Sequence, residues 1–133
     1  MKKKIASLGV AATAAAGILI MPGTAQASSG GGCTSAWADD GDQVSACISA
    51  SGSNLEPDGY VIDAHICTTA HVLLADETTK TLVLDDNVGC GTGHVGPFAY
   101  KGVNGHKYQS EVYIEESNIQ IVSAASPVET LSY

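Results

Sequence analysis

The most regular alternation of apolar and polar residues in the chain runs from Tyr60 to Leu74. Its even-numbered positions are largely apolar, while its odd-numbered positions include Asp63 and His71, which is the pattern of a strand that buries one face. The stretch is longer than the usual strand of about 3–10 residues. It therefore predicts two strands or one bent strand, with the break near Ala64-His65 or Thr68-Thr69.

Shorter stretches of the same kind predict strands on both sides of this one. Val44–Ser49 alternates after an acidic turn, and Gly52–Asn54 with Pro57–Gly59 is expected to form a loop that ends in a turn just before Tyr60. Thr81–Leu84 is a second apolar run after a polar segment, so it is predicted to form a hairpin with the strand that precedes it.

The C-terminal part of the chain predicts another hairpin. Tyr108–Glu115 and Ile119–Ser123 alternate on either side of the polar turn Glu116–Asn118. The glycine-rich segment Gly89–Gly105 is expected to be a surface loop, and Ala124–Tyr133 is expected to be a tail. Because no amphipathic helix is predicted after residue 27, the predicted fold class is all-β: a small antiparallel β-sandwich of about six to eight strands.

Residues 1–27 match a secretory signal peptide. They contain a basic start at Lys2–Lys4, an apolar run at Ile5–Ile20 and the cleavage motif Ala25–Ala27. Cleavage leaves a product that begins at Ser28, so we expect a secreted, extracellular protein with no membrane anchor after signal cleavage.

The sequence after the signal peptide predicts a short leader and one domain. Ser28–Gly32 has no apolar residue and is expected to be a flexible leader, while residues 33–133 form the β-sandwich domain. From Ser28 onward, three lysines and 14 acidic residues give a formal net charge of −11, and the chain has no arginine. This charge disfavours nucleic acid and membranes as partners. The acidity either keeps the protein soluble or attracts a basic partner or a cation.

Four cysteines in an exported chain of this length predict two disulfides. Three pairings are possible. We favour Cys33–Cys47 with Cys67–Cys90, because sequential pairs need the least long-range organisation.

Several polar clusters raise the question of a metal site. A zinc site could draw on one side of the long alternation and on later histidines, namely Asp63, His65, Cys67, His71, His94 and His106. Calcium could use the acidic runs Asp39, Asp40 and Asp42, or Asp85, Asp86 and Asn87. A disulfide would remove Cys67 as a ligand, and neither acidic run has the spacing of an EF-hand loop. We therefore predict no metal and no cofactor.

Catalytic signatures are weak as well. The chain has no Gly-x-Ser-x-Gly motif, and its paired carboxylates stand in acidic turns rather than in an apolar wall that would raise one pKa. The stretch from Gly91 to Gly96 matches the letters of a dinucleotide fingerprint, but Pro97 follows where a helix would have to begin. We predict that the protein is not an enzyme. Aromatic side chains with a polar tip dominate many binding sites, and the candidate partner-binding residues are Phe98, Tyr100, Tyr108 and Tyr113.

The signal peptide, the four cysteines and the alternating strands together resemble the small secreted two-disulfide β proteins of actinomycetes. That group includes protease and amylase inhibitors, chromoprotein apoproteins and adaptor subunits of umbrella-shaped toxin particles. The resemblance covers most of the chain after residue 27, as architecture and cysteine number, and carries over no functional residue. It implies a non-enzymatic protein-binding module, an adaptor or assembly component whose partner is another secreted protein. The alternatives are an inhibitor of a secreted hydrolase, a small-ligand or carbohydrate binder, and a small hydrolase.

Overall fold

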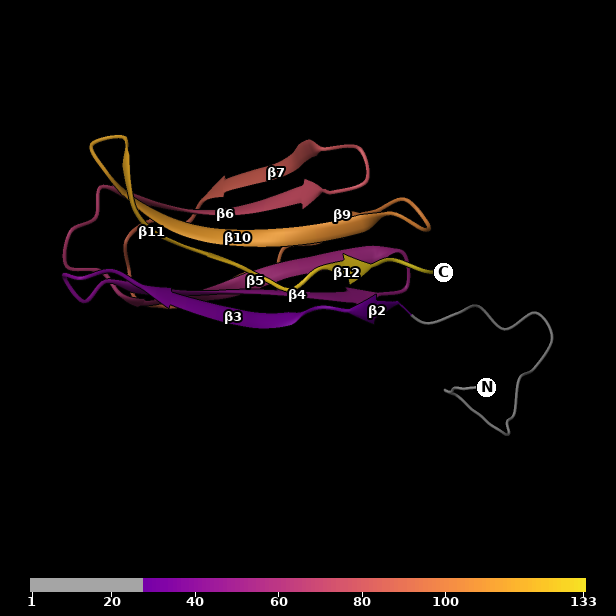
Figure 1. Ribbon diagram of the computed structural model, residues 1–133, viewed down its shortest axis with the longest axis horizontal. Helices are drawn as coiled ribbons and strands as arrows, with labels where there is room; N and C mark the ends of the chain where they lie inside the picture. Colours follow the sequence, from indigo (N-terminus) through magenta and orange to yellow (C-terminus); the bar gives the residue numbers. More distant parts are fainter. Residues whose placement is uncertain (1–27) are drawn as a thin grey trace.

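Two antiparallel sheets lie face to face in the computed structural model, which describes residues 28–133 (Figure 1). The predicted all-β sandwich is confirmed. The predicted signal peptide lies outside the described residues.

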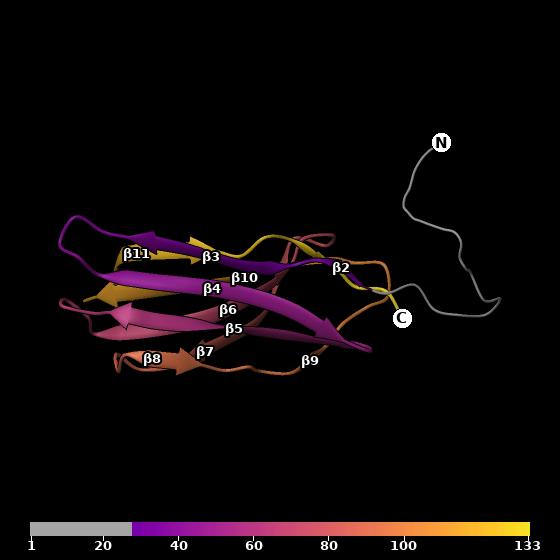
Figure 2. The same cartoon turned by 90° about the horizontal axis from the view of Figure 1, so that it is seen from below.

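The first sheet has six strands, in the order β2-β12-β10-β6-β7, with β11 also paired to β10. Their bounds are Ser29–Gly30 (β2), Thr69–Asp76 (β6), Thr81–Asn87 (β7), Lys107–Glu116 (β10), Ile119–Ala125 (β11) and Glu129–Thr130 (β12). The second sheet has five strands, in the order β3-β4-β5-β8, with β9 also paired to β5 (Figure 2). Their bounds are Gly32–Trp37 (β3), Gln43–Ser51 (β4), Asn54–Asp63 (β5), Gly93–Val95 (β8) and Tyr100–Lys101 (β9).

Both predicted hairpins are confirmed, as β6–β7 and β10–β11. The core lies between the two sheets, where alternate residues of the long strands turn inward. Val44 from β4, Val72 from β6 and Val112 from β10 meet there, each with no exposed surface. A second buried cluster surrounds Leu55 and Tyr108.

The long alternating stretch divides as predicted, since β5 ends at Asp63 and β6 begins at Thr69. Its first half nevertheless faces the opposite way from the prediction. Tyr60 and Ile62 are 43% and 45% exposed, whereas Val61 is fully buried. The cause is the irregular segment between the strands, which carries the chain from one sheet to the other, so the inward positions are odd in β5 and even in β6.

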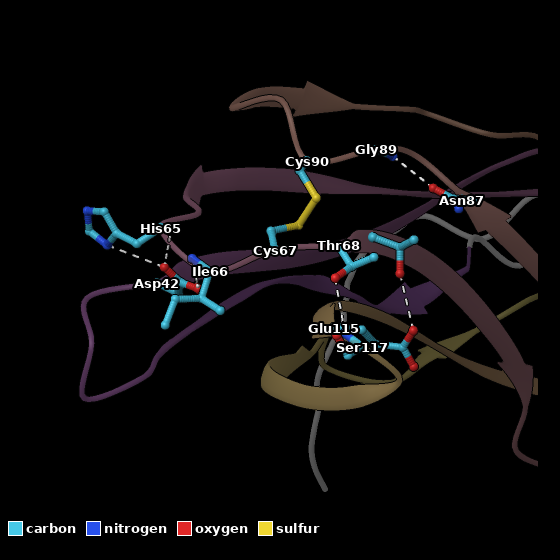
Figure 3. The surroundings of a disulfide bond; sticks show 11 residues. Asp42, His65, Ile66, Cys67, Thr68, Asn87, Gly89, Cys90, Glu115 and Ser117 are labelled. Atoms are coloured by element: carbon cyan, nitrogen blue, oxygen red, sulfur yellow. Dashed lines mark hydrogen bonds and ion pairs between the residues drawn. A yellow bond between two sulfur atoms is a disulfide. The ribbon is translucent and has the colours of Figure 1, made fainter.

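Backbone amides of this connecting segment donate hydrogen bonds to a side chain at one end and to a backbone carbonyl group at the other. The carboxylate of Asp42, which has no exposed surface, accepts from the amides of His65 and Ile66 (Figure 3). At the other end, the amide of Thr68 donates to the carbonyl oxygen of Glu115 at 2.7 Å. The bonds to Asp42 replace the strand pairing that the backbone lacks at this point.

The turn expected at Pro57–Gly59 is wrong, because these residues lie inside β5. Proline is tolerated there because β8 pairs with β5 from Gly59 onward and β9 pairs only at Asn54 and Leu55, which leaves a gap in the ladder beside Pro57. Gly59 is required for close approach rather than for a turn, since a Cβ atom would lie 2.0 Å from the carbonyl oxygen of Ser45.

The structure has eleven strands in residues 28–133, more than the six to eight expected from the sequence. The additional strands are short. Gly89–Gly105, expected to be a loop, contains β8 and β9, and the C-terminal tail contains β12. Ser28–Gly32, expected to be a flexible leader, contains β2 and the start of β3. A strand of two or three residues is too short to show alternation, so its pairing cannot be recognised in the sequence.

The favoured disulfide pairing is confirmed. Cys33 and Cys47 lie directly opposite each other on β3 and β4, with their Cα atoms 4.0 Å apart. Cys67 and Cys90 join the β5–β6 connection to the segment that follows β7 (Figure 3).

Candidate functional site

A groove with a volume of about 820 Å³ is lined in part by the two ends of the described chain, Ser28 and Tyr133. These ends lie together at one end of the sandwich (Figure 2). We call this groove the terminal groove. Its lining residues come from β2 to β5, β12 and the C-terminal end: Ser28, Gly30, Gly32, Cys33, Cys47, Ile48, Ser49, Ala50, Gly52, Asp58, Tyr60, Glu129, Ser132 and Tyr133.

The terminal groove exists because β3 leaves the edge of β4 before β4 ends. The ladder between them extends only as far as Gly32 opposite Ile48. The chain then crosses at Gly31 to the other sheet, where β2 pairs with β12. The crossing needs glycine, because Gly31 has a φ of +76° and a Cβ atom there would lie 2.2 Å from Oε1 of Glu129.

As a result, the last residues of β4 border the groove without a paired β3 residue beside them. A pair of residues only 4.0 Å apart, such as Cys33 and Cys47, is a non-hydrogen-bonded pair of an antiparallel ladder. Ile48 therefore directs its N–H and C=O toward β3, and Ala50, two residues further on, directs its own toward the same side, beyond the end of β3. The edge at Ala50 offers one backbone donor and one backbone acceptor.

Hydrogen-bond acceptors and aromatic rings stand out among the side chains in and beside the groove. Glu129 on β12 is 4% exposed, and burial raises the pKa of its carboxyl group. At the other end, Asp58 Oδ2 lies 2.6 Å from Nε2 of His94. The ring of Tyr60 lies against the same histidine, with ring centroids 4.9 Å apart. No lysine lines the groove, so its electrostatics favour a ligand that donates hydrogen bonds or carries positive charge.

None of the four predicted partner-binding residues lines this groove. The structure brings Tyr100 and Tyr108 together, with ring centroids 6.3 Å apart, in the core cluster around Leu55. Tyr108 has no exposed surface, and its hydroxyl accepts a 2.9 Å hydrogen bond from the amide of Val103. Burial raises the pKa of this hydroxyl. The prediction that Tyr108 is a surface anchor is therefore wrong. Phe98 and Tyr100 are half-buried against the two core clusters.

Tyr113 lies apart from the other three, on the outer face of the six-stranded sheet. Its ring stacks on His71 with a centroid distance of 5.0 Å. Burial, with the nearby carboxylates of Glu115, Asp85 and Glu111, raises the pKa of the Tyr113 hydroxyl. A hollow on this face, lined by Leu73, Gln109 and Glu111 among others, measures about 110 Å³.

The histidines considered for zinc are dispersed, and each lies beside an aspartate. The distances are 3.3 Å for His65 and Asp42, 2.8 Å for His71 and Asp85, 2.6 Å for His94 and Asp58, and 2.7 Å for His106 and Asp76. Cys67 is oxidised, and Asp42 accepts hydrogen bonds from backbone amides. In residues 28–133, no three His, Cys, Asp or Glu side chains are grouped as they would be around a metal ion.

Sequence reasoning missed the groove residues Glu129, Tyr60 and Ala50. Glu129 belongs to a segment read as a tail, and Tyr60 was assigned to the buried face. Comparisons with protein-family models, with curated proteins and with solved structures found no match to the chain. The part of the chain that the structure describes contains no helix with the length and apolar character needed to cross a membrane.

Proposed function

We propose that the protein is a secreted, non-catalytic binding module that holds an extended segment of another secreted protein, as an adaptor or assembly component of an extracellular complex. The observation that carries the proposal is the terminal groove running beside the open edge of β4 at Ala50. Two disulfides suit an oxidising compartment, which fits a protein that works outside the cell.

The binding mode follows from the geometry of the edge. An extended segment can add to a sheet edge by main-chain hydrogen bonds, while side-chain pockets select the sequence. Here the bound segment would take the place beside Ala50 that β3 vacates after Gly32. Tyr60 and Tyr133, which are 43% and 44% exposed, would supply aromatic contact area at the two ends of the groove.

The experiment compares two neutral substitutions on the same strand. Ser49 lines the groove and Ser51 does not, and both are exposed. The purified protein is immobilised, partners are captured from the medium of the producing culture, and the affinity for the captured protein is measured. Ser49→Tyr is expected to weaken binding by about tenfold or more, that is by about 1.4 kcal/mol. Ser51→Tyr is expected to leave the affinity within about twofold, with both variants folded by circular dichroism.

Equal loss or equal retention of binding in the two variants would place the contact elsewhere. If no protein is captured and the purified chain hydrolyses a generic ester or peptide substrate, the hydrolase alternative replaces the proposal. If a captured protease is inhibited, and substitutions beside Cys90 abolish the inhibition whereas Ser49→Tyr does not, the inhibitor alternative replaces the proposal.

A further inference from the structure

Glu129 stands out among the buried acidic groups because no residue in 28–133 neutralises its carboxylate or donates a hydrogen bond to it. Asp42 and Asp76 are equally buried, but each accepts hydrogen bonds from backbone amides. No described residue donates a hydrogen bond to the carboxylate of Glu129, and none of the three lysines after residue 27 forms an ion pair with it. Its environment raises its pKa through burial alone.

An ionised carboxylate in this position costs free energy unless a partner compensates it. The space next to it is the terminal groove, which Glu129 helps to line. Gly31 packs against the carboxylate, since a Cβ atom at this position would lie 2.2 Å from Oε1 of Glu129. Because Glu129 lines the groove, its side chain is reached from there.

The other acidic residue of the groove does not offer the same opportunity. Asp58 already has a close partner, since its Oδ2 atom lies 2.6 Å from Nε2 of His94. The uncompensated charge of the groove is therefore concentrated at Glu129. A side chain with a positive charge at the end of a long stem would reach a buried carboxylate from an edge strand, and only lysine and arginine have this form.

We propose that Glu129 is the recognition site for a lysine or arginine side chain of the segment that the terminal groove binds. The inference rests on the proposed function and adds to it the chemistry of the partner. The bound cation would supply the hydrogen-bond donors that the described part of the chain does not provide.

The test uses small probes and one matched pair of variants. The probes are the Nα-acetyl N-methylamides of lysine, arginine and norleucine, the last being the uncharged apolar analogue of lysine. Binding is followed by the amide chemical shifts of the ¹⁵N-labelled protein. The variants are Glu129→Gln and Glu116→Gln, which remove the same charge; Glu116 is exposed and lies at the β10–β11 turn, outside the groove.

We expect saturable shifts at Gly30, Gly32 and Glu129 with the two cationic probes, and at least about tenfold weaker binding of norleucine. Glu129→Gln should weaken cation binding by a similar factor, while Glu116→Gln should leave it unchanged. Equal binding of norleucine and lysine, or undiminished cation binding to Glu129→Gln, would refute the inference. Should Glu129→Gln fail to fold, the comparison of lysine with norleucine on the unmodified protein still decides.

The two proposals fail in distinguishable ways. If partner capture depends on Ser49 but not on Glu129, and the cationic probes do not bind, the proposed recognition of a basic side chain by Glu129 is wrong. The proposal that the groove binds an extended segment then stands. If Ser49→Tyr and Ser51→Tyr bind the partner alike, the proposed function fails whatever the probes show.

Discussion

The pair of buried Asp76 and half-buried His106 makes a sharp test of how the histidine–aspartate pairs contribute to stability. Asp76 is 5% exposed, and its two oxygen atoms have separate tasks. Oδ1 accepts hydrogen bonds from the amides of Thr78 and Thr79 at 2.9 and 3.1 Å. Oδ2 lies 2.7 Å from Nδ1 of His106, just before β10 begins.

Asp76→Asn separates these tasks, because an amide oxygen can keep both bonds in the turn while the NH₂ group faces His106. The substitution removes one charge-assisted hydrogen bond from a buried site, which costs about 1.5–3 kcal/mol. Asp85→Asn is the matched control. Asp85 lies 2.8 Å from His71, but its side chain is 45% exposed, so its loss should cost less than about 1 kcal/mol.

The pH dependence gives an independent measure of the same pair. Burial acts to raise the pKa of Asp76, but the hydrogen bonds from His106, Thr79 and Thr78 outweigh it and lower this pKa below 3.8. A carboxyl group whose pKa is lowered on folding stabilises the protein fully above its unfolded value of about 3.9, and the stabilisation is lost as the pH falls through the folded-state pKa. The free-energy difference between the original protein and Asp76→Asn should therefore shrink on acidification.

The assay is urea unfolding at a series of pH values, followed by far-ultraviolet circular dichroism. The disulfides stay intact, and the dependence of the unfolding free energy on urea should be the same for all three proteins. A free-energy difference that does not change between pH 7 and pH 3, or an equal cost for Asp85→Asn and Asp76→Asn, would show that the Asp76–His106 pair is not the source of this stability.

Two further predictions concern the disulfide and the corrected aromatic. Replacing Cys67 and Cys90 together by serine opens a bridge that spans 23 positions and should lower the unfolding free energy by about 3 kcal/mol, measured by urea unfolding; an unchanged value would mean that the hydrogen bonds around this connection suffice without it. Tyr108→Phe removes the acceptor for the amide of Val103 and the hydroxyl that interacts with Asp76, and it should cost about 1 kcal/mol while leaving partner capture unchanged; loss of capture at unchanged stability would restore Tyr108 as an anchor.

The parts of the fold that could be predicted are those determined by neighbouring residues. The hairpin from Tyr108 to Ser123 shows its alternation and its turn within one continuous segment. The break after Asp63 is visible from length alone. The direction in which the Tyr60 side chain points is not visible in the sequence, because it depends on the sheet to which its strand belongs. The five residues after Asp63 carry the chain from one sheet to the other without a recognisable signal.

The terminal groove belongs to the part that no local pattern predicts. Its features are the crossing at Gly31, the open edge at Ala50 and the carboxylate of Glu129, which lie far apart in the sequence. They meet because β12 pairs with both β2 and β10, while the amide of Gly31 donates to the carbonyl oxygen of Val128 at 2.9 Å. Each of these pairings covers only one or two residues, so each depends on long strands already being in place. Glu129, which the sequence places in a C-terminal tail, is thereby a buried acceptor beside the open edge of β4 at Ala50.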